Sequence, residues 1–117
     1  MTFKLADDHE LDVLLSLNGF EFQFAAGYQV KIAARLVEST AGRPHGIKYS
    51  LTLHEPAGQR IYGLDNAHGI RRRRAEFDHR HVYGRRRVMP YIYRGPTELL
   101  EDFYREVERI LTERGVL

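Results

Sequence analysis

The stretch IKYSLTLHEPAGQRIYGL, residues 47–64, decides the fold. Residues 47–54 alternate between apolar and polar side chains, which is typical of a strand with one buried face. Glu-Pro-Ala-Gly at 55–58 has the composition of a tight turn, and residues 59–64 return as the partner strand. The stretch therefore predicts an antiparallel β-hairpin.

Further strands are predicted on both sides of this hairpin. Residues 20–24 and 28–37 alternate in the same way, and residues 86–93 form another candidate strand. Residues 8–19 are ambiguous, because their leucines have helical spacing while Asn18-Gly19 could also be a hairpin turn. We favour a short helix for this segment.

The last segment predicts a C-terminal helix over about residues 96–114. Pro96 suits the first helical position, and Gly115 suits the residue just after the helix end. One apolar stripe runs along it, formed by Leu99, Phe103, Val107 and Ile110. We therefore expect an α+β fold, in which an antiparallel sheet of four to five strands carries this helix on one face. Residues 1–117 would form a single domain.

Composition excludes several classes of protein. The 117 residues include no Cys, which rules out disulfide scaffolds, thiolate zinc sites and cysteine nucleophiles. No apolar run approaches the roughly 20 residues of a membrane helix, and the N-terminus lacks the apolar core of a signal peptide. We therefore expect a cytoplasmic protein that does not enter the membrane.

The net charge of +2 hides a strong segregation of charge. Residues 1–24 carry a net −4 and residues 95–117 a net −3, whereas residues 71–94 carry nine arginines against two acids, a net +7. The arginines proposed to contact nucleic acid are Arg71, Arg72, Arg73, Arg74, Arg80, Arg85, Arg86 and Arg87. The guanidinium group matches phosphate with two parallel hydrogen bonds, so the segment predicts a polyanion-binding surface. A solvated basic loop, or an arm paired with the acidic helix, is the alternative.

Two polar clusters are candidates for chemistry, Asp65-Asn66-Ala67-His68 and Asp78-His79-Arg80-His81. In an extended backbone, His79 and His81 share one face and Asp78 and Arg80 the other. Two imidazoles on one face could cleave a phosphodiester by acid–base catalysis, with Asp65 or Asp78 orienting one of them.

Other interpretations of the histidines stay open. His79, His81 and an aspartate could instead bind zinc or a transition metal, or the histidines could be structural. The candidates for the catalytic site are His79, His81, Asp78, Asp65 and Asn66, with no metal and no cofactor.

The order of the motifs resembles a known family. The motifs are Gly46-x-Lys48-Tyr49-x-Leu51, Asp65-Asn66, Asp78-His79-Arg80-His81, Pro90-Tyr91-x-Tyr93 and Leu99-Leu100-x-Asp102-Phe103. Over residues 28–110 this order resembles the TumE-like toxin family, whose most specific pattern is Gly-Asp-His-Arg-His. This chain departs from the pattern with Phe77 in place of the glycine and with extra arginines before the motif.

The resemblance implies a toxin of a toxin–antitoxin pair, whose partner is an antitoxin with a helix-turn-helix DNA-binding domain. By analogy with other small basic toxins, the target would be RNA. The leading hypothesis is a metal-independent ribonuclease, with Arg80 and Arg85 contacting phosphate. A non-enzymatic module that binds nucleic acid or the antitoxin, and a metal-dependent hydrolase, are the alternatives. Exposed strand edges also leave a homodimer open.

Overall fold

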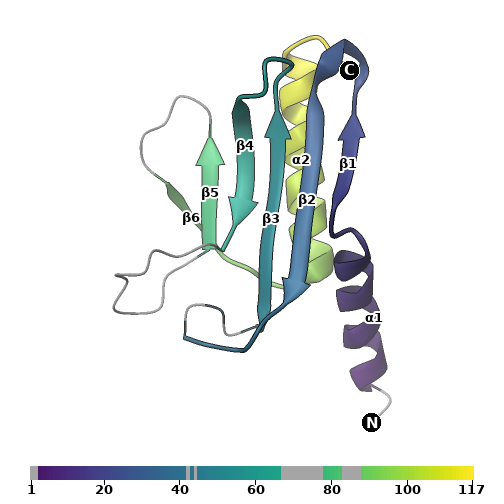
Figure 1. Ribbon diagram of the computed structural model, residues 1–117, viewed down its shortest axis with the longest axis vertical. Coiled ribbons are helices and arrows are strands. Elements are labelled where there is room, and N and C mark those ends of the chain that lie inside the picture. The colour runs from purple at the N-terminus through teal and green to yellow at the C-terminus, as the bar shows by residue number, and fades with distance from the viewer. Residues whose placement is uncertain (1–2, 42, 44, 67–77, 83–87) are drawn as a thin grey trace.

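The computed structural model describes residues 3–41, 43, 45–66, 78–82 and 88–117 (Figure 1). The described residues form six strands, two α-helices and one 3-10 helix. In chain order, the elements are α1 (Phe3–Ser16), β1 (Phe20–Gln23), η1 (Ala25–Gly27), β2 (Gln29–Leu36), β3 (Ile47–His54), β4 (Arg60–Asp65), β5 (Asp78–Val82), β6 (Met89–Tyr91) and α2 (Pro96–Glu113).

The six strands form one antiparallel sheet in the order of the sequence, from β1 to β6. The α+β class is confirmed, but the expected four to five strands were one or two too few. The strand that was not expected is β5, because its Asp-His-Arg-His sequence lacks an apolar alternation. The strand expected at 86–93 is observed only as Met89–Tyr91, and residues 86–87 lie outside the described residues.

The predicted hairpin is present as β3 and β4, and it lies at the centre of the sheet. Alternate residues of β3 are buried, and Leu51 and Leu53 are fully inaccessible to solvent. These residues face α2, which lies behind the sheet in Figure 1. Tyr62 of β4 stacks on Phe103 of α2, with ring centroids 6.1 Å apart, so the core lies between the sheet and this helix.

The two helices follow the sequence expectations. The predicted stripe of α2 is buried, and Gly115 lies just past its end with a left-handed φ of 78°. Of the two interpretations of residues 8–19, the helix is observed, although α1 begins at Phe3, before the predicted segment. It ends at Ser16, and Gly19 adopts a φ of 85° in the turn that leads into β1. No helix among the described residues is long and apolar enough to cross a membrane.

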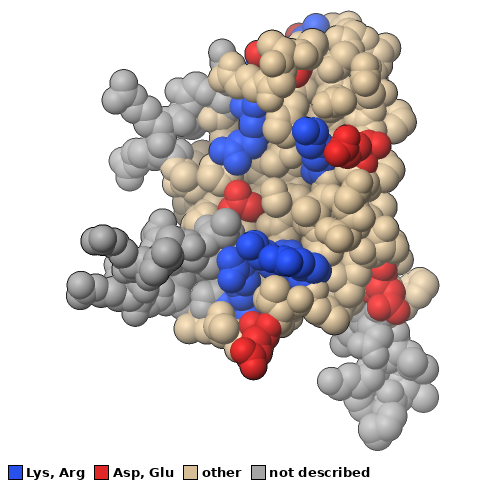
Figure 2. Space-filling view, viewed as in Figure 1, with Lys and Arg blue, Asp and Glu red and all other residues tan. Residues whose placement is uncertain are grey.

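The side of the sheet opposite α2 is called the outer face. It carries alternate residues of the central strands, namely 31, 33 and 35 of β2, 48, 50 and 52 of β3, 63 and 65 of β4, and 79 and 81 of β5. In Figure 1 the sheet lies in front of α2, so the space-filling view in Figure 2 shows this outer face. Polar residues are concentrated on it, because no helix covers it in the described part of the chain.

Candidate active site

Strand register brings polar residues of three strands into rows across the outer face. The two rows are Ser50–Asp65–His79 and Thr52–Gly63–His81. The residues of one row are direct cross-strand neighbours, and the two rows are about 7 Å apart along the strands. Residues that are far apart in the sequence therefore meet at one place on the sheet.

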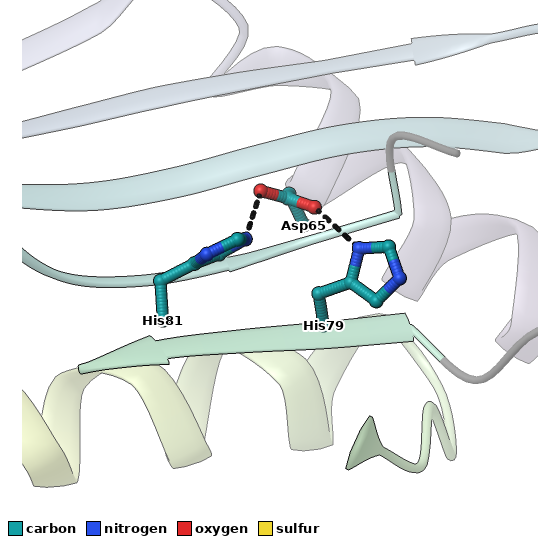
Figure 3. Close-up of side chains that lie close together, drawn as sticks. All are labelled: Asp65, His79 and His81. Atoms are coloured by element: carbon teal, nitrogen blue, oxygen red, sulfur yellow. Dashed lines mark ion pairs between the residues drawn. The ribbon is translucent and has the colours of Figure 1, made fainter. Parts of the chain in front are cut away.

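A single carboxylate, Asp65, contacts both histidines of β5 (Figure 3). Its Oδ1 lies 3.3 Å from Nδ1 of His79, and its Oδ2 lies 2.9 Å from Nε2 of His81. The two rings point toward Asp65 from the neighbouring strand, and their centroids are 6.0 Å apart at an interplanar angle of 82°. The carboxylate therefore positions two imidazoles at once.

His81 has an unusual environment. Its Nε2 is buried and, within the described residues, has no hydrogen-bond partner, although the Asp65 carboxylate is only 2.9 Å away. The contact is thus a short polar contact without the direction of a hydrogen bond, and it becomes an ion pair only when His81 is protonated. Burial lowers the pKa of His81, the charge of Asp65 opposes this effect, and the charge of Arg60 adds to it. The net lowering favours the neutral imidazole near pH 7.

Gly63 leaves room for a cation beside His81. Gly63 of β4 and His81 of β5 are direct cross-strand partners. A Cβ at Gly63 would lie 3.4 Å from Cδ of Arg60 and 3.3 Å from Cγ2 of Thr52, so both of these side chains lie over the glycine. A larger residue at 63 would push Arg60 away from this part of the outer face. The absence of a side chain therefore lets the Arg60 side chain lie here, where its charge acts on His81.

Asp78, a predicted catalytic residue, is not brought to the histidines. It lies on the inner face, where it is buried, and its Oδ2 accepts a hydrogen bond of 2.6 Å from the Tyr49 hydroxyl. Burial, the hydrogen bond and the charge of Asp78 together raise the pKa of Tyr49 far above its usual value. The pair links β3 to β5 through the core and thereby supports the strand that carries His79.

Asn66, the second predicted catalytic residue outside the cluster, binds the backbone at the start of β3. Its Oδ1 accepts the backbone N–H of Tyr49 at 3.0 Å, and its Nδ2 donates to the carbonyl of Ile47 at 2.6 Å. The residue is 2% exposed, so these bonds replace water in a buried position. Asn66 therefore holds the chain in place directly after Asp65.

Arg80 lies on the inner face, away from the histidines that it neighbours in the sequence. Its guanidinium carbon is 6.0 Å from the ring centroid of Tyr91, and its Nε is buried without a hydrogen-bond partner among the described residues. The other predicted phosphate contacts, Arg71, Arg72, Arg73, Arg74, Arg85, Arg86 and Arg87, lie outside the described residues.

Sequence reasoning missed the cations that the register places beside Asp65. Arg60 reaches the outer face over Gly63, and Arg35 and Lys48 lie on that face one row from Ser50 and Asp65. Their signal in the sequence was the strand alternation, which puts Arg35 and Lys48 on the polar face of their strands. Which strand positions face each other depends on the register, and no single strand records it.

The cluster also has the composition of a metal site. One ligand atom from each of Asp65, His79 and His81 lies within 4.8 Å of the others. Two imidazoles and a carboxylate are ligands that zinc and other transition metals accept, with further positions left for water or substrate. The same three residues can therefore act as an acid–base cluster or hold a metal ion. The two uses exclude each other, because Nδ1 of His79 and Nε2 of His81 cannot contact Asp65 through a proton and bind a metal ion at the same time.

The chain belongs to the TumE toxin family. The family described as Toxin TumE matches residues 5–111 of the 117 residues, which confirms the resemblance seen in the motifs. A toxin of this kind implies an antitoxin partner. No curated protein and no solved structure matches the chain.

Proposed function

We propose that this toxin cleaves RNA, with His79 and His81 as an acid–base pair and Asp65 as the residue that orients both rings. The observation that carries the proposal is the contact of two imidazoles with one carboxylate on a sheet face that neither described α-helix covers. Imidazole is the side chain whose usual pKa suits proton transfer in both directions near pH 7. Asp65 occupies the orienting position that such a pair requires.

The reaction divides the two proton transfers between the histidines. A neutral imidazole removes the proton of a 2′-hydroxyl, and the 2′-oxygen attacks phosphorus. The bond from phosphorus to the 5′-oxygen breaks, and an imidazolium gives its proton to that oxygen. The products are a 2′,3′-cyclic phosphate and a 5′-hydroxyl. Burial lowers the pKa of His81, which suits it to the role of base and leaves the acid role to His79.

Arg60 is the described cation best placed to stabilise the negative charge that develops on phosphorus. It lies over Gly63 and acts electrostatically on His81. A guanidinium can form two parallel hydrogen bonds with phosphate oxygens. In this proposal Arg60 takes the place of Arg80, because the Arg80 side chain is on the other side of the sheet.

The test uses single and double substitutions of the histidines. We expect His79→Ala and His81→Ala each to lower RNA cleavage by about 10²-fold or more, as general acid–base groups do. His9→Ala, an exposed histidine of α1, is the matched control. An RNA with a single 2′-deoxy position at the cleavage site should resist cleavage there. Undiminished cleavage and growth arrest by the double variant would rule out the proposal.

A metal-dependent hydrolase is the second candidate, favoured by the spacing of the three ligand atoms. It predicts that activity disappears in chelator and returns with zinc or manganese. Calorimetric titration of those ions into the metal-free protein, after the chelator has been removed, should then show one site that Asp65→Ala removes. Full activity in chelator favours the acid–base pair.

The antitoxin partner completes the proposal. The family resemblance supports an antitoxin with a helix-turn-helix domain, encoded next to the toxin. Co-expression of such a neighbouring gene should relieve growth arrest. If the toxin arrests growth and binds RNA without cleaving it at any protein concentration, the protein is a binding module instead of an enzyme.

A further inference from the structure

Two cations face each other on the outer face beside the candidate active site. Arg35 of β2 and Lys48 of β3 are direct cross-strand partners. In the described part of the chain neither has a carboxylate within ion-pair distance, whereas the arginines in and near α2 do. Those paired arginines are Arg94, Arg105, Arg109 and Arg114. Like charges placed directly opposite in a sheet destabilise it, so the pair is suited to an anion that neutralises both.

The two cations border a hollow that extends to Asp65. The hollow has a volume of about 430 Å³, and Asn18 and Ser50 complete its polar lining. Asn18 Oδ1 accepts the backbone N–H of Ala34 at 3.0 Å, which holds the amide in place and leaves its NH₂ group as a donor. Figure 2 shows Lys and Arg gathered over the lower ends of β2 and β3 on this face. The polar side chains that line the hollow from the outer face can therefore all donate a hydrogen bond, except that of Asp65.

We propose that this hollow binds a backbone phosphate of single-stranded RNA, next to the phosphate at the histidines. This inference rests on the proposed function, because it names how the same substrate is held. Lys48 lies one row from Asp65, a separation of about 7 Å along the strands, so one extended RNA strand crosses both places. Arg35 supplies a two-pronged contact, Lys48 a point charge, and Ser50 a hydroxyl donor.

Charge and position favour RNA over an acidic segment of the antitoxin as the occupant. Asp65 is both the wall of the hollow and the residue that contacts His79 and His81. A substrate phosphate at the histidines therefore places the adjoining nucleotide at the cation pair. An acidic peptide would be attracted by the same charges, and the experiment includes it as an outcome that overturns the proposal.

Binding is measured on a protein that cannot cleave, so that binding and chemistry are separated. The parent is the His79→Ala/His81→Ala variant, titrated into a fluorescein-labelled single-stranded RNA of mixed sequence at several salt concentrations. Adding Arg35→Gln and Lys48→Gln should weaken binding about tenfold. The slope of log affinity against log salt is negative, and its magnitude should fall by about 0.7, because one phosphate is no longer neutralised. The thermal unfolding midpoint should stay the same or rise, because the repulsion is removed.

The matched control removes the same charge from the opposite side of the molecule. Arg105→Gln/Arg109→Gln affects exposed arginines of α2 that are paired with acids, and it should leave RNA affinity within about twofold of the parent. Equal losses of affinity in both double variants, or unchanged affinity in Arg35→Gln/Lys48→Gln, would overturn the phosphate site. So would unchanged RNA binding together with loss of antitoxin binding. If the parent binds RNA as described but the native protein never cleaves it, the proposed reaction fails and the phosphate site stands.

Discussion

The buried hydrogen bond between Tyr49 and Asp78 gives a prediction with a defined size. Tyr49 is 3% exposed, Asp78 is 8% exposed, and the Tyr49 hydroxyl donates to the Asp78 carboxylate over 2.6 Å. A hydrogen bond to a charged group contributes about 1.5–3 kcal/mol. Tyr49→Phe removes the donor while keeping the ring, so we expect the free energy of unfolding at pH 7 to fall by about 2 kcal/mol. The thermal midpoint should fall by about 8 °C.

The same substitution should change how stability depends on pH. Burial, the hydrogen bond and the charge of Asp78 raise the pKa of Tyr49, so the folded protein keeps its proton above pH 10. The unfolded chain loses that proton near pH 10, and the free energy of unfolding then falls by about 1.4 kcal/mol per pH unit. The Tyr49→Phe variant lacks this loss. The gap between the two proteins should therefore narrow from about 2 kcal/mol at pH 7 to about 0.6 kcal/mol at pH 11.

The assay is urea unfolding followed by circular dichroism at pH 7, 9, 10 and 11. Tyr62 and Tyr93, whose pKa values burial raises to about 12, are present in both proteins, so their contributions cancel. Tyr104→Phe is the control, because this exposed tyrosine of α2 makes no hydrogen bond among the described residues, and it should cost less than about 0.5 kcal/mol. A gap that is below about 0.5 kcal/mol at pH 7, or constant up to pH 11, would refute the reasoning.

Three further predictions concern other contacts. Asp65→Asn should lower the pKa of His81 further, seen by NMR titration, because the carboxylate opposes the effect of burial. Asn66→Ala should destabilise the protein by about 2–3 kcal/mol in urea unfolding, because it removes two buried hydrogen bonds. Burial raises the pKa of Asp102, but hydrogen bonds from Tyr91, Arg94 and Arg105 outweigh it, and the net pKa is lowered. Asp102→Asn should therefore lower the free energy of unfolding by about 1 kcal/mol at pH 7. The loss should be smaller below pH 4, where protonation removes the stabilising effect of the carboxylate from the native protein as well.

Sequence periodicity predicted the elements that have an apolar pattern. The β3–β4 hairpin and α2 are observed within a residue or two of their predicted bounds. Alternation also predicted that His79 and His81 share a face, and their contacts with Asp65 agree. The strand β5 was not expected because its side chains are polar, so no core-facing pattern marked it. Its pairing with β4 and β6 comes from backbone hydrogen bonds, which leave no trace in side-chain composition.

The choice of carboxylate illustrates the limit of sequence reasoning. Asp78 is adjacent to His79 in the chain, yet alternation turns it to the inner face, where Tyr49 binds it. Asp65 is fourteen positions from His79 in the numbering, but the β4–β5 register makes the two residues direct partners. Both aspartates were candidates from the sequence. Neighbours along a strand point to opposite faces, whereas direct partners on adjacent strands share a face, and the sequence does not show which residues are partners.

The sequence by itself determined the class of protein: an α+β fold without cysteine, a pair of histidines on one strand face, and membership of a toxin family. Only the tertiary structure decided which side chains meet. Register brought Asp65 to both histidines and paired Arg35 with Lys48 beside them. The physical reason is that alternation acts within a strand and is written in the chain, whereas register depends on how strands pack together.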